Sequence, residues 1–144
     1  MPMHNLSKAV KITKVKAASA TSTAQVDADT LDMQGYEGVV FQTVIGTANT
    51  GNYVKVGQGA ASDGSDKADL AGSKVTISTD GMIAFVDVFR PTKRYLTASV
   101  VRGATTTVGE VYALQYRGAQ QAENNIVANK STGKLLVSPA EGTA

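Results

Sequence analysis

The chain has 144 residues, enough for one domain, and 42% of them are hydrophobic while 18% are charged. It contains no cysteine, which excludes disulfides and thiolate metal sites and suits a protein made in a reducing cytoplasm. No run of about 18 apolar residues is present, so no membrane span is predicted. The first residues lack the apolar segment of a signal peptide.

The net charge of +2 is unevenly distributed. The first sixteen residues carry four lysines and no acidic residue, namely Lys8, Lys11, Lys14 and Lys16, which leaves ten basic and twelve acidic residues in the rest. This basic arm fits a solvated edge strand that resists aggregation, a contact with an acidic protein surface, or a contact with nucleic acid. Because no aromatic residue lies among the lysines, the stacking platform of a single-strand binder is missing, and direct nucleic-acid binding is not predicted.

Segments rich in Val, Ile and Thr, separated by Gly, Asn and Asp, predict short strands along most of the chain. In the first half these segments are 8–16, an edge strand, then 38–46, 53–57 and 74–79. Segment 21–26 fits either a strand or a flexible bridge. In segment 38–46, alternation places Val39, Phe41, Thr43 and Ile45 on one face. The polar stretch 57–73 is predicted to be a long loop.

The stretch 82–101 is the most apolar part of the sequence and is predicted to form the centre of the fold. Residues 82–89 alternate without a clear polar face, which indicates a strand covered on both sides, with Phe85 in the core. Asp80-Gly81 predicts a hairpin turn before this strand. Pro91 interrupts it, and residues 94–101 resume alternation, so the two segments are predicted to form a central hairpin.

The remaining sequence gives one more strand and then changes character. Residues 110–116 alternate, with Val111, Ala113 and Gln115 opposite Tyr112, Leu114 and Tyr116. Beyond residue 118 the chain is polar, with one or two helical turns at most in 119–125. We therefore predict an all-β protein: a single antiparallel β-sandwich, jelly-roll-like or barrel domain over residues 17–117. A basic arm or edge strand, 1–16, and an extended tail, 118–144, flank it, and both are expected to become ordered on contact.

Few residues offer reaction chemistry. The only histidine is His4, near the N-terminus, so a Ser-His-Asp triad or a histidine-based zinc site lacks its members. Asp63, Asp66 and Asp69 could approach calcium, but their spacing departs from the EF-hand pattern, and a solvated acidic loop is the preferred interpretation. We predict no enzymatic activity, no cofactor and no metal. Asp87, in the central strand, is expected to pair with Arg90 or Arg94.

Three stretches carry a resemblance to a known family. They are Asp32 to Phe41 (DMQGYEGVVF), Asp69 to Ser73 (DLAGS) and Val86 to Leu96 (VDVFRPTKRYL). Within residues 25–117 the sequence resembles small virion proteins of tailed bacteriophages that are encoded near the major capsid protein and act as capsid decoration, or cement, proteins. The resemblance implies a β-fold protein, commonly a homotrimer, that binds the outside of the expanded capsid and stabilises it. It supplies no catalytic residues.

On this interpretation the partners are the major capsid protein and further copies of the chain. The location is the outside of the virion, after synthesis in the host cytoplasm. The candidate interface residues are Lys8, Lys11, Lys14, Lys16, Arg90, Arg94 and Tyr95. Two alternatives stay open: another phage structural subunit, from the tail or the head–tail joint, and a carbohydrate-binding or hydrolytic β-sandwich.

Overall fold

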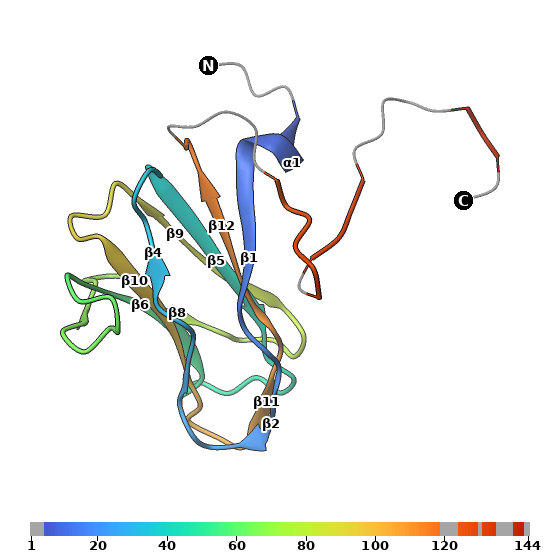
Figure 1. The fold of residues 1–144 in the computed structure, drawn as a ribbon. Coiled ribbons are helices and arrows are strands. Elements are labelled where there is room, and N and C mark those ends of the chain that lie inside the picture. Colours follow the sequence, from blue (N-terminus) through green and yellow to red (C-terminus); the bar gives the residue numbers. More distant parts are fainter. Residues whose placement is uncertain (1–4, 119–123, 130, 135–139, 143–144) are drawn as a thin grey trace.

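In the computed structural model two antiparallel β-sheets pack face to face, which confirms the predicted all-β sandwich (Figure 1). The structure describes residues 5–118, 124–129, 131–134 and 140–142. The segment for which one or two helical turns were considered, 119–125, lies outside these ranges except for its last two residues. The only helix in the described part is one turn, α1 (Leu6–Ala9), directly before the first strand.

The first sheet has the strand order β1-β12-β5-β9. Its strands are β1 (Val10–Lys16), β12 (Val111–Tyr116), β5 (Gly38–Val44) and β9 (Ile83–Phe89). β1 and β9 are the two edges, so the prediction of an N-terminal edge strand is confirmed. β1 is part of the sandwich itself, because it pairs with β12 and its Val15 belongs to the core between the sheets.

The second sheet is centred on the pair β10 (Tyr95–Val101) and β6 (Tyr53–Gly59). Two short strands extend it beside β10: β3 (Val26–Asp27) and β4 (Leu31–Asp32). Two more lie beside β6: β7 (Ala68–Asp69) and β8 (Val75–Thr76). A separate ribbon pairs β2 (Ser19–Ser22) with β11 (Thr106–Val108) at one end of the domain.

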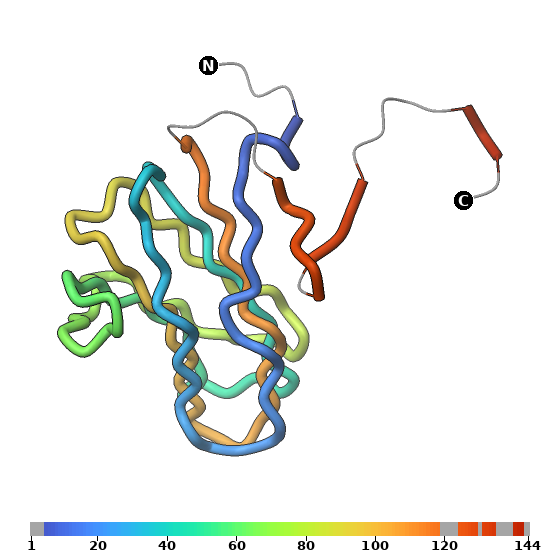
Figure 2. The backbone as a smooth tube through the Cα atoms, in the orientation of Figure 1, coloured from blue at the N-terminus to red at the C-terminus, as the bar shows by residue number. Residues whose placement is uncertain are grey.

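The chain passes repeatedly between the two sheets. After β1 it crosses the lower end of the domain through the β2–β11 ribbon, then rises through β3 and β4 and turns into β5 (Figure 2). The buried guanidinium of Arg102 holds this end together: it donates to the carbonyl oxygens of Ala24 at 2.6 Å, Ala20 at 2.8 Å and Thr106 at 3.0 Å. A buried charge without hydrogen bonds would be costly, and these three carbonyls compensate for its burial.

The core lies between the sheets and follows the predicted alternation. On β5 the buried side chains are Val39, Phe41 and Thr43, followed by Ile45 just beyond the strand. On β10 the predicted apolar residues Leu96, Ala98 and Val100 are all buried. Val111, Ala113 and Gln115 form the buried side of β12, as alternation predicts.

The predicted central hairpin is wrong. β9 is an edge strand that pairs with β5, whereas β10 lies in the other sheet and pairs with β6. Asp80-Gly81 does form a turn, with positive φ at Gly81, but the preceding β8 pairs with β6 and not with β9. Phe85 is 60% exposed, so its predicted place in the core is wrong too. One face of β9 packs on the core through Ala84 and Val86, and the other is open.

Candidate interaction surface

The most unusual surface of the molecule is the side of the first sheet that faces away from the second, here called the outer face. Because cross-strand partners in an antiparallel sheet point to the same side, the register defines its members. They are Val10, Ile12 and Lys14 on β1; Tyr112, Leu114 and Tyr116 on β12; Val40, Gln42 and Val44 on β5; and Ile83, Phe85, Asp87 and Phe89 on β9. The exposed fraction reaches 64% at Ile83, 60% at Phe85 and 49% at Phe89. Contiguous apolar surface of this kind marks protein–protein contact sites.

One end of the outer face is an aromatic cluster framed by arginines. The ring of Phe89 stacks on that of Tyr116, with their centroids 6.5 Å apart. The guanidinium carbons of Arg90 and Arg117 lie 5.0 Å and 5.3 Å from the centroid of the Phe89 ring, within the range of cation–π attraction. The Glu37 carboxylate serves both arginines, at 3.9 Å from Arg90 and 3.4 Å from Arg117.

Arg90 and Arg117 share an unusual backbone conformation. Each follows the last residue of its strand with φ of 53°, in the left-handed region that costs a non-glycine residue about 1–2 kcal/mol. The backbone of Glu37 links the two strand ends: its N–H donates to the carbonyl of Tyr116, and its carbonyl accepts from the N–H of Arg90 at 2.6 Å. Strain held in place by neighbouring contacts is characteristic of functional sites.

The predicted pairing of Asp87 with Arg90 or Arg94 is wrong. Its carboxylate accepts a hydrogen bond of 2.6 Å from the hydroxyl of Tyr116, two strands away on β12. Burial of the phenol, together with this negatively charged acceptor, raises the pKa of Tyr116 to about 12. Arg94 is engaged elsewhere, in a bidentate pair with Asp32 whose two N–O distances are both 2.8 Å.

The seven predicted interface residues form two separate groups. The four lysines lie on α1 and β1: Lys8 and Lys14 are exposed, and Lys11 and Lys16 are half-buried. Arg90, Arg94 and Tyr95 lie at the turn from β9 to β10, on the other side of the domain. Three strand spacings, about 14 Å, separate β1 from β9. Lys14 and Arg90 border the outer face, whereas Tyr95 begins a strand of the second sheet.

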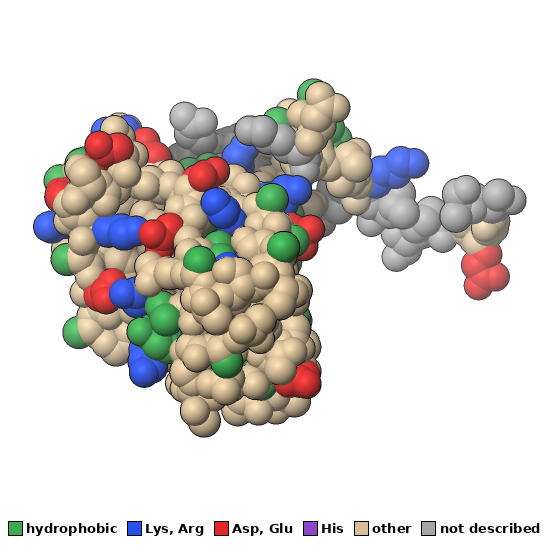
Figure 3. Space-filling model, turned by 90° about the horizontal axis from the view of Figure 1, so that it is seen from below, with side chains coloured by type: hydrophobic (Ala, Val, Ile, Leu, Met, Phe, Trp, Pro, Cys, Tyr) green, Lys and Arg blue, Asp and Glu red, His purple; other side chains and the backbone are tan. Residues whose placement is uncertain are grey.

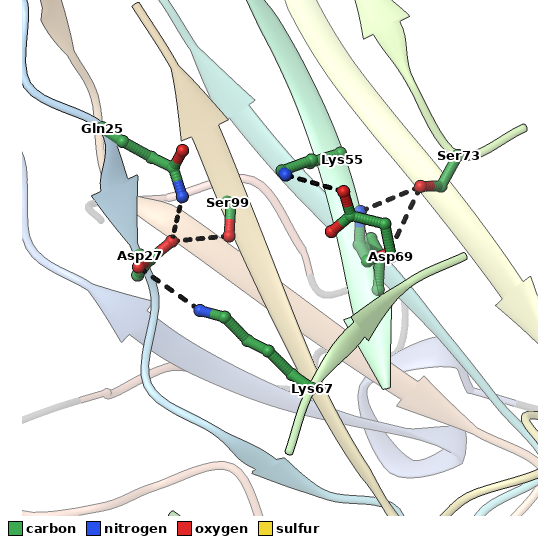
Figure 4. A network of polar contacts seen from close by, with 8 residues as sticks. Gln25, Asp27, Lys55, Lys67, Asp69, Ser73 and Ser99 are labelled. Carbon is green, nitrogen blue, oxygen red and sulfur yellow. Dashed lines mark hydrogen bonds and ion pairs between the residues drawn. The ribbon is translucent and has the colours of Figure 1, made fainter. Parts of the chain in front are cut away.

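The acidic loop considered for calcium is tied to the second sheet by its own contacts (Figure 4). Asp69 pairs with Lys55 at 2.8 Å, and Lys67 reaches Asp27 at 3.3 Å. The Asp66 carboxylate accepts the backbone N–H groups of Ala60 and Ala61, which lower its pKa. Among the described residues no three His, Cys, Asp or Glu side chains gather as metal ligands.

Asp27 shows how the carboxylates of the second sheet are stabilised (Figure 4). Burial alone would raise its pKa, but hydrogen bonds from Ser99 at 2.6 Å and Gln25 at 2.8 Å, with Lys67 nearby, lower it overall. Seen from below, the molecule has basic and acidic side chains next to one another, with hydrophobic ones in small separate groups (Figure 3). The outer face differs because its large apolar side chains are contiguous in register.

No protein-family model matches the sequence, and no curated protein matches it significantly. Within the described residues, no helix has the length and apolarity needed to cross a membrane. The surface therefore has to be interpreted from its own chemistry.

The sequence contained a signal for the outer face. Asp87 shares the alternation of Ile83, Phe85 and Phe89, and a carboxylate on that side indicates contact with solvent. Three large apolar neighbours on the same side outweighed that single charge in the prediction. The contacts of Arg117 and Tyr116 had no signal, because they join residues that are 27 or more positions apart in the sequence.

Proposed function

We propose that the protein is a structural virion protein of a tailed bacteriophage that binds the outer surface of the capsid and stabilises it. The resemblance of residues 25–117 to decoration proteins supports this proposal. The observation that carries it is the outer face: exposed Ile83, Phe85 and Phe89 lie in one sheet, bordered by Lys14, Arg90 and Arg117. A protein surface with an apolar centre and acidic margin is the complementary partner.

A homotrimer fits this function. An icosahedral shell offers three-fold and quasi-three-fold positions, where a closed cyclic trimer presents the same contact to each surrounding subunit. Once one contact has formed, the other two become intramolecular, so weak contacts add to a stable attachment. On this proposal the outer face meets the major capsid protein on the outside of the virion, after synthesis in the host cytoplasm.

Co-sedimentation tests the proposal directly. Shells assembled from the major capsid protein of the phage that encodes this chain are prepared before and after expansion and mixed with the purified protein. Binding to expanded shells is expected, and absence of binding to either form overturns the proposed function. Imaging of the native particle checks the location, since density on the tail or the head–tail joint would favour that alternative. Retention on a glycan array, without shell binding, would favour the carbohydrate-binding one.

A pair of single substitutions tests the role of the outer face. Phe85→Ser removes a 60% exposed ring from this face, while Leu6→Ser changes a side chain of similar exposure, 58%, on α1. We expect Phe85→Ser to weaken shell binding by about tenfold or more, because central aromatic residues dominate interface energies, and Leu6→Ser to bind like wild type. Equal affinity of the two variants would show that the outer face is not the contact.

A further inference from the structure

We infer that the free edge of β9 accepts an extended segment of the shell protein as an added β-strand. This inference rests on the proposed function and names a second mode of contact besides the outer face. In the described part of the chain, β9 is the last strand of the first sheet, and its one ladder partner is β5. A strand edge of seven residues with exposed apolar side chains favours pairing with another chain, unless it is covered.

The backbone groups available on this edge follow from the register. The N–H of Arg90 donates to the carbonyl of Glu37, in line with the β5–β9 ladder. In an antiparallel ladder successive residues direct their N–H and C=O groups to alternate sides. Ala84, Val86 and Val88 therefore bond to β5. The N–H and C=O groups directed away from β5 belong to Ile83, Phe85, Asp87 and Phe89.

A groove runs beside this edge. It has a volume of about 390 Å³ and lies between residues 86–92 on one side and Leu70–Ser73 with Gln58 on the other. Leu70 and Val88 are only partly buried and pack at the margin of the core, so the sandwich is not closed here. An inward-facing apolar side chain of the added segment would cover Leu70 and Val88.

The opposite edge of the same sheet is already occupied by the chain itself. The side chain of Asn125 donates to the carbonyls of Ser7 and Val10, both at 2.8 Å, and accepts from the N–H of Ile12 at 2.8 Å. The described part of the tail next to this residue, 124–129, therefore lies at β1 and not at β9 (Figure 1). Strand addition is thus directed to β9.

Charge identifies the chemistry of the added segment. Arg90 stands at the end of the groove with a side chain that is 71% exposed, and it shares the single Glu37 carboxylate with Arg117. Two guanidiniums against one carboxylate leave a positive charge for a partner. The fitting occupant is an extended segment with apolar side chains at alternate positions and a carboxylate near Arg90. Main-chain hydrogen bonds provide affinity in such contacts, and the alternate side chains provide specificity.

Amide hydrogen exchange tests the inference on the wild-type protein. Exchange is measured by NMR on the free protein. In a second sample the protein exchanges while it is bound to expanded shells, and it is then released from the shells for the NMR measurement. In the free protein the amides of residues 84, 86 and 88 should exchange slowly, and those of 85, 87 and 89 quickly. When the protein is bound to shells, exchange at residues 85, 87 and 89 should slow by about tenfold or more.

Three results would overturn the inference, and they differ in meaning. Shells that bind the protein while residues 85, 87 and 89 still exchange quickly would exclude strand addition and leave the proposed function intact. If the shells bind no protein, the proposed function is overturned, and with it the shell protein as the source of the added strand. Protection that rises with protein concentration in the absence of shells would assign the edge to a second copy of this chain.

A matched pair of variants isolates the backbone contribution. Asp87→Ala and Asp87→Pro both remove the carboxylate, but only proline also removes an N–H that points to the free edge. Proline is tolerated on edge strands where its missing N–H faces away from the ladder. Asp87→Pro should bind shells about tenfold more weakly than Asp87→Ala. Equal affinities of two variants that both retain the wild-type circular dichroism spectrum would overturn the inference.

Discussion

Tyr116 on β12 reaches across β5 to donate a 2.6 Å hydrogen bond to Asp87 on β9. The ring can make this crossing because Gly38, the β5 residue paired with both Tyr116 and Phe89, has no side chain. A Cβ atom built at Gly38 would overlap the Tyr116 ring. A glycine in β5 thus allows a side-chain contact between two strands that are not neighbours, and this contact positions the aromatic cluster at the end of the outer face.

Gly38→Ala should therefore destabilise the protein by displacing the Tyr116 ring. Overpacking of this kind costs about 1–3 kcal/mol, and the melting temperature should fall accordingly. Thermal unfolding followed by circular dichroism measures the effect. In a Tyr116→Leu background the same alanine should cost clearly less, because the ring is gone. An equal cost in both backgrounds would show that the clash is not the cause.

The titration of Tyr116 provides a second prediction. Burial and the Asp87 carboxylate raise its pKa to about 12 from the ordinary 10.0. Because the folded-state pKa is raised, the stabilisation is fully present below pH 10 and is lost as pH rises through the folded value. NMR of the tyrosine ring carbons, with five tyrosines in the chain, should show Tyr116 titrating late.

Asp87→Ala is the control for this titration. It removes the acceptor and its charge but leaves the ring half-buried, so the Tyr116 pKa should fall and still stay above 10. An unchanged pKa in this variant would assign the whole shift to burial. If Tyr116 titrates with the other tyrosines in wild type, the hydrogen bond does not persist in solution.

Phe41 and Phe85 allow a comparison of two phenylalanines on neighbouring strands. Phe41 is fully buried, whereas Phe85 is 60% exposed on the outer face. Phe41→Ala should cost about 3–5 kcal/mol, the usual range for core phenylalanines, and Phe85→Ala less than about 1 kcal/mol. Urea unfolding of both variants measures the difference. A loss at Phe85 as large as that at Phe41 would mean that the ring is buried in solution, for example by self-association.

The sequence predicted the elements better than their arrangement. Alternation correctly identified the apolar core-facing sides of the segments around Phe41, Ala98 and Ala113, because side chains alternate with a period of two along a strand. On β10 the opposite side, with Thr97 and Ser99, is buried as well. The same reasoning failed for β9, whose open side carries Ile83, Phe85 and Phe89. An exposed apolar strand face has the same local pattern as a core-facing one.

Strand order could not be predicted from local sequence. Residues 82–101 have the composition of a hairpin, but the left-handed backbone of Arg90 and the turn through Pro91 lead β10 into the other sheet. β9 pairs instead with β5, about 45 residues away in the sequence. Such pairings depend on contacts across the whole domain, which no window of ten residues contains. For the same reason, Asp87 was assigned to nearby arginines when its partner is the distant Tyr116.

The Asp32–Arg94 pair gives a prediction at acid pH. Hydrogen bonds from the Arg94 guanidinium hold the pKa of Asp32 below its ordinary value of 3.8. A lowered folded-state pKa means that the stabilisation is present above about pH 4 and is lost as pH falls through the folded value. Asp32→Asn should lower the urea midpoint at neutral pH and reduce the further drop on acidification. A drop as large as that of wild type would show that Asp32 adds nothing to the acid sensitivity.

The lysines of the first strand give the last prediction, which concerns attachment to the shell. Changing Lys8, Lys11, Lys14 and Lys16 together to Ser should leave the sandwich folded, because Val15 and the backbone pairing with β12 hold β1 in place. Shell occupancy should fall, and its decline with added salt should become shallower, because salt weakens attraction between exposed charges. Sedimentation over a range of ionic strengths measures both effects.

A matched pair of double variants separates the position of the charges from their number. Lys8→Ser with Lys14→Ser removes two exposed charges from α1 and β1, and Lys67→Ser with Lys74→Ser removes two from the loops beside the second sheet. Both double variants lower the net charge equally, so a long-range effect of charge predicts equal losses of shell binding. A local contact with acidic shell surface predicts a loss only in the first variant. Since an exposed pair contributes about 0.2–1 kcal/mol, the loss per subunit is small, and a trimer multiplies it over three sites.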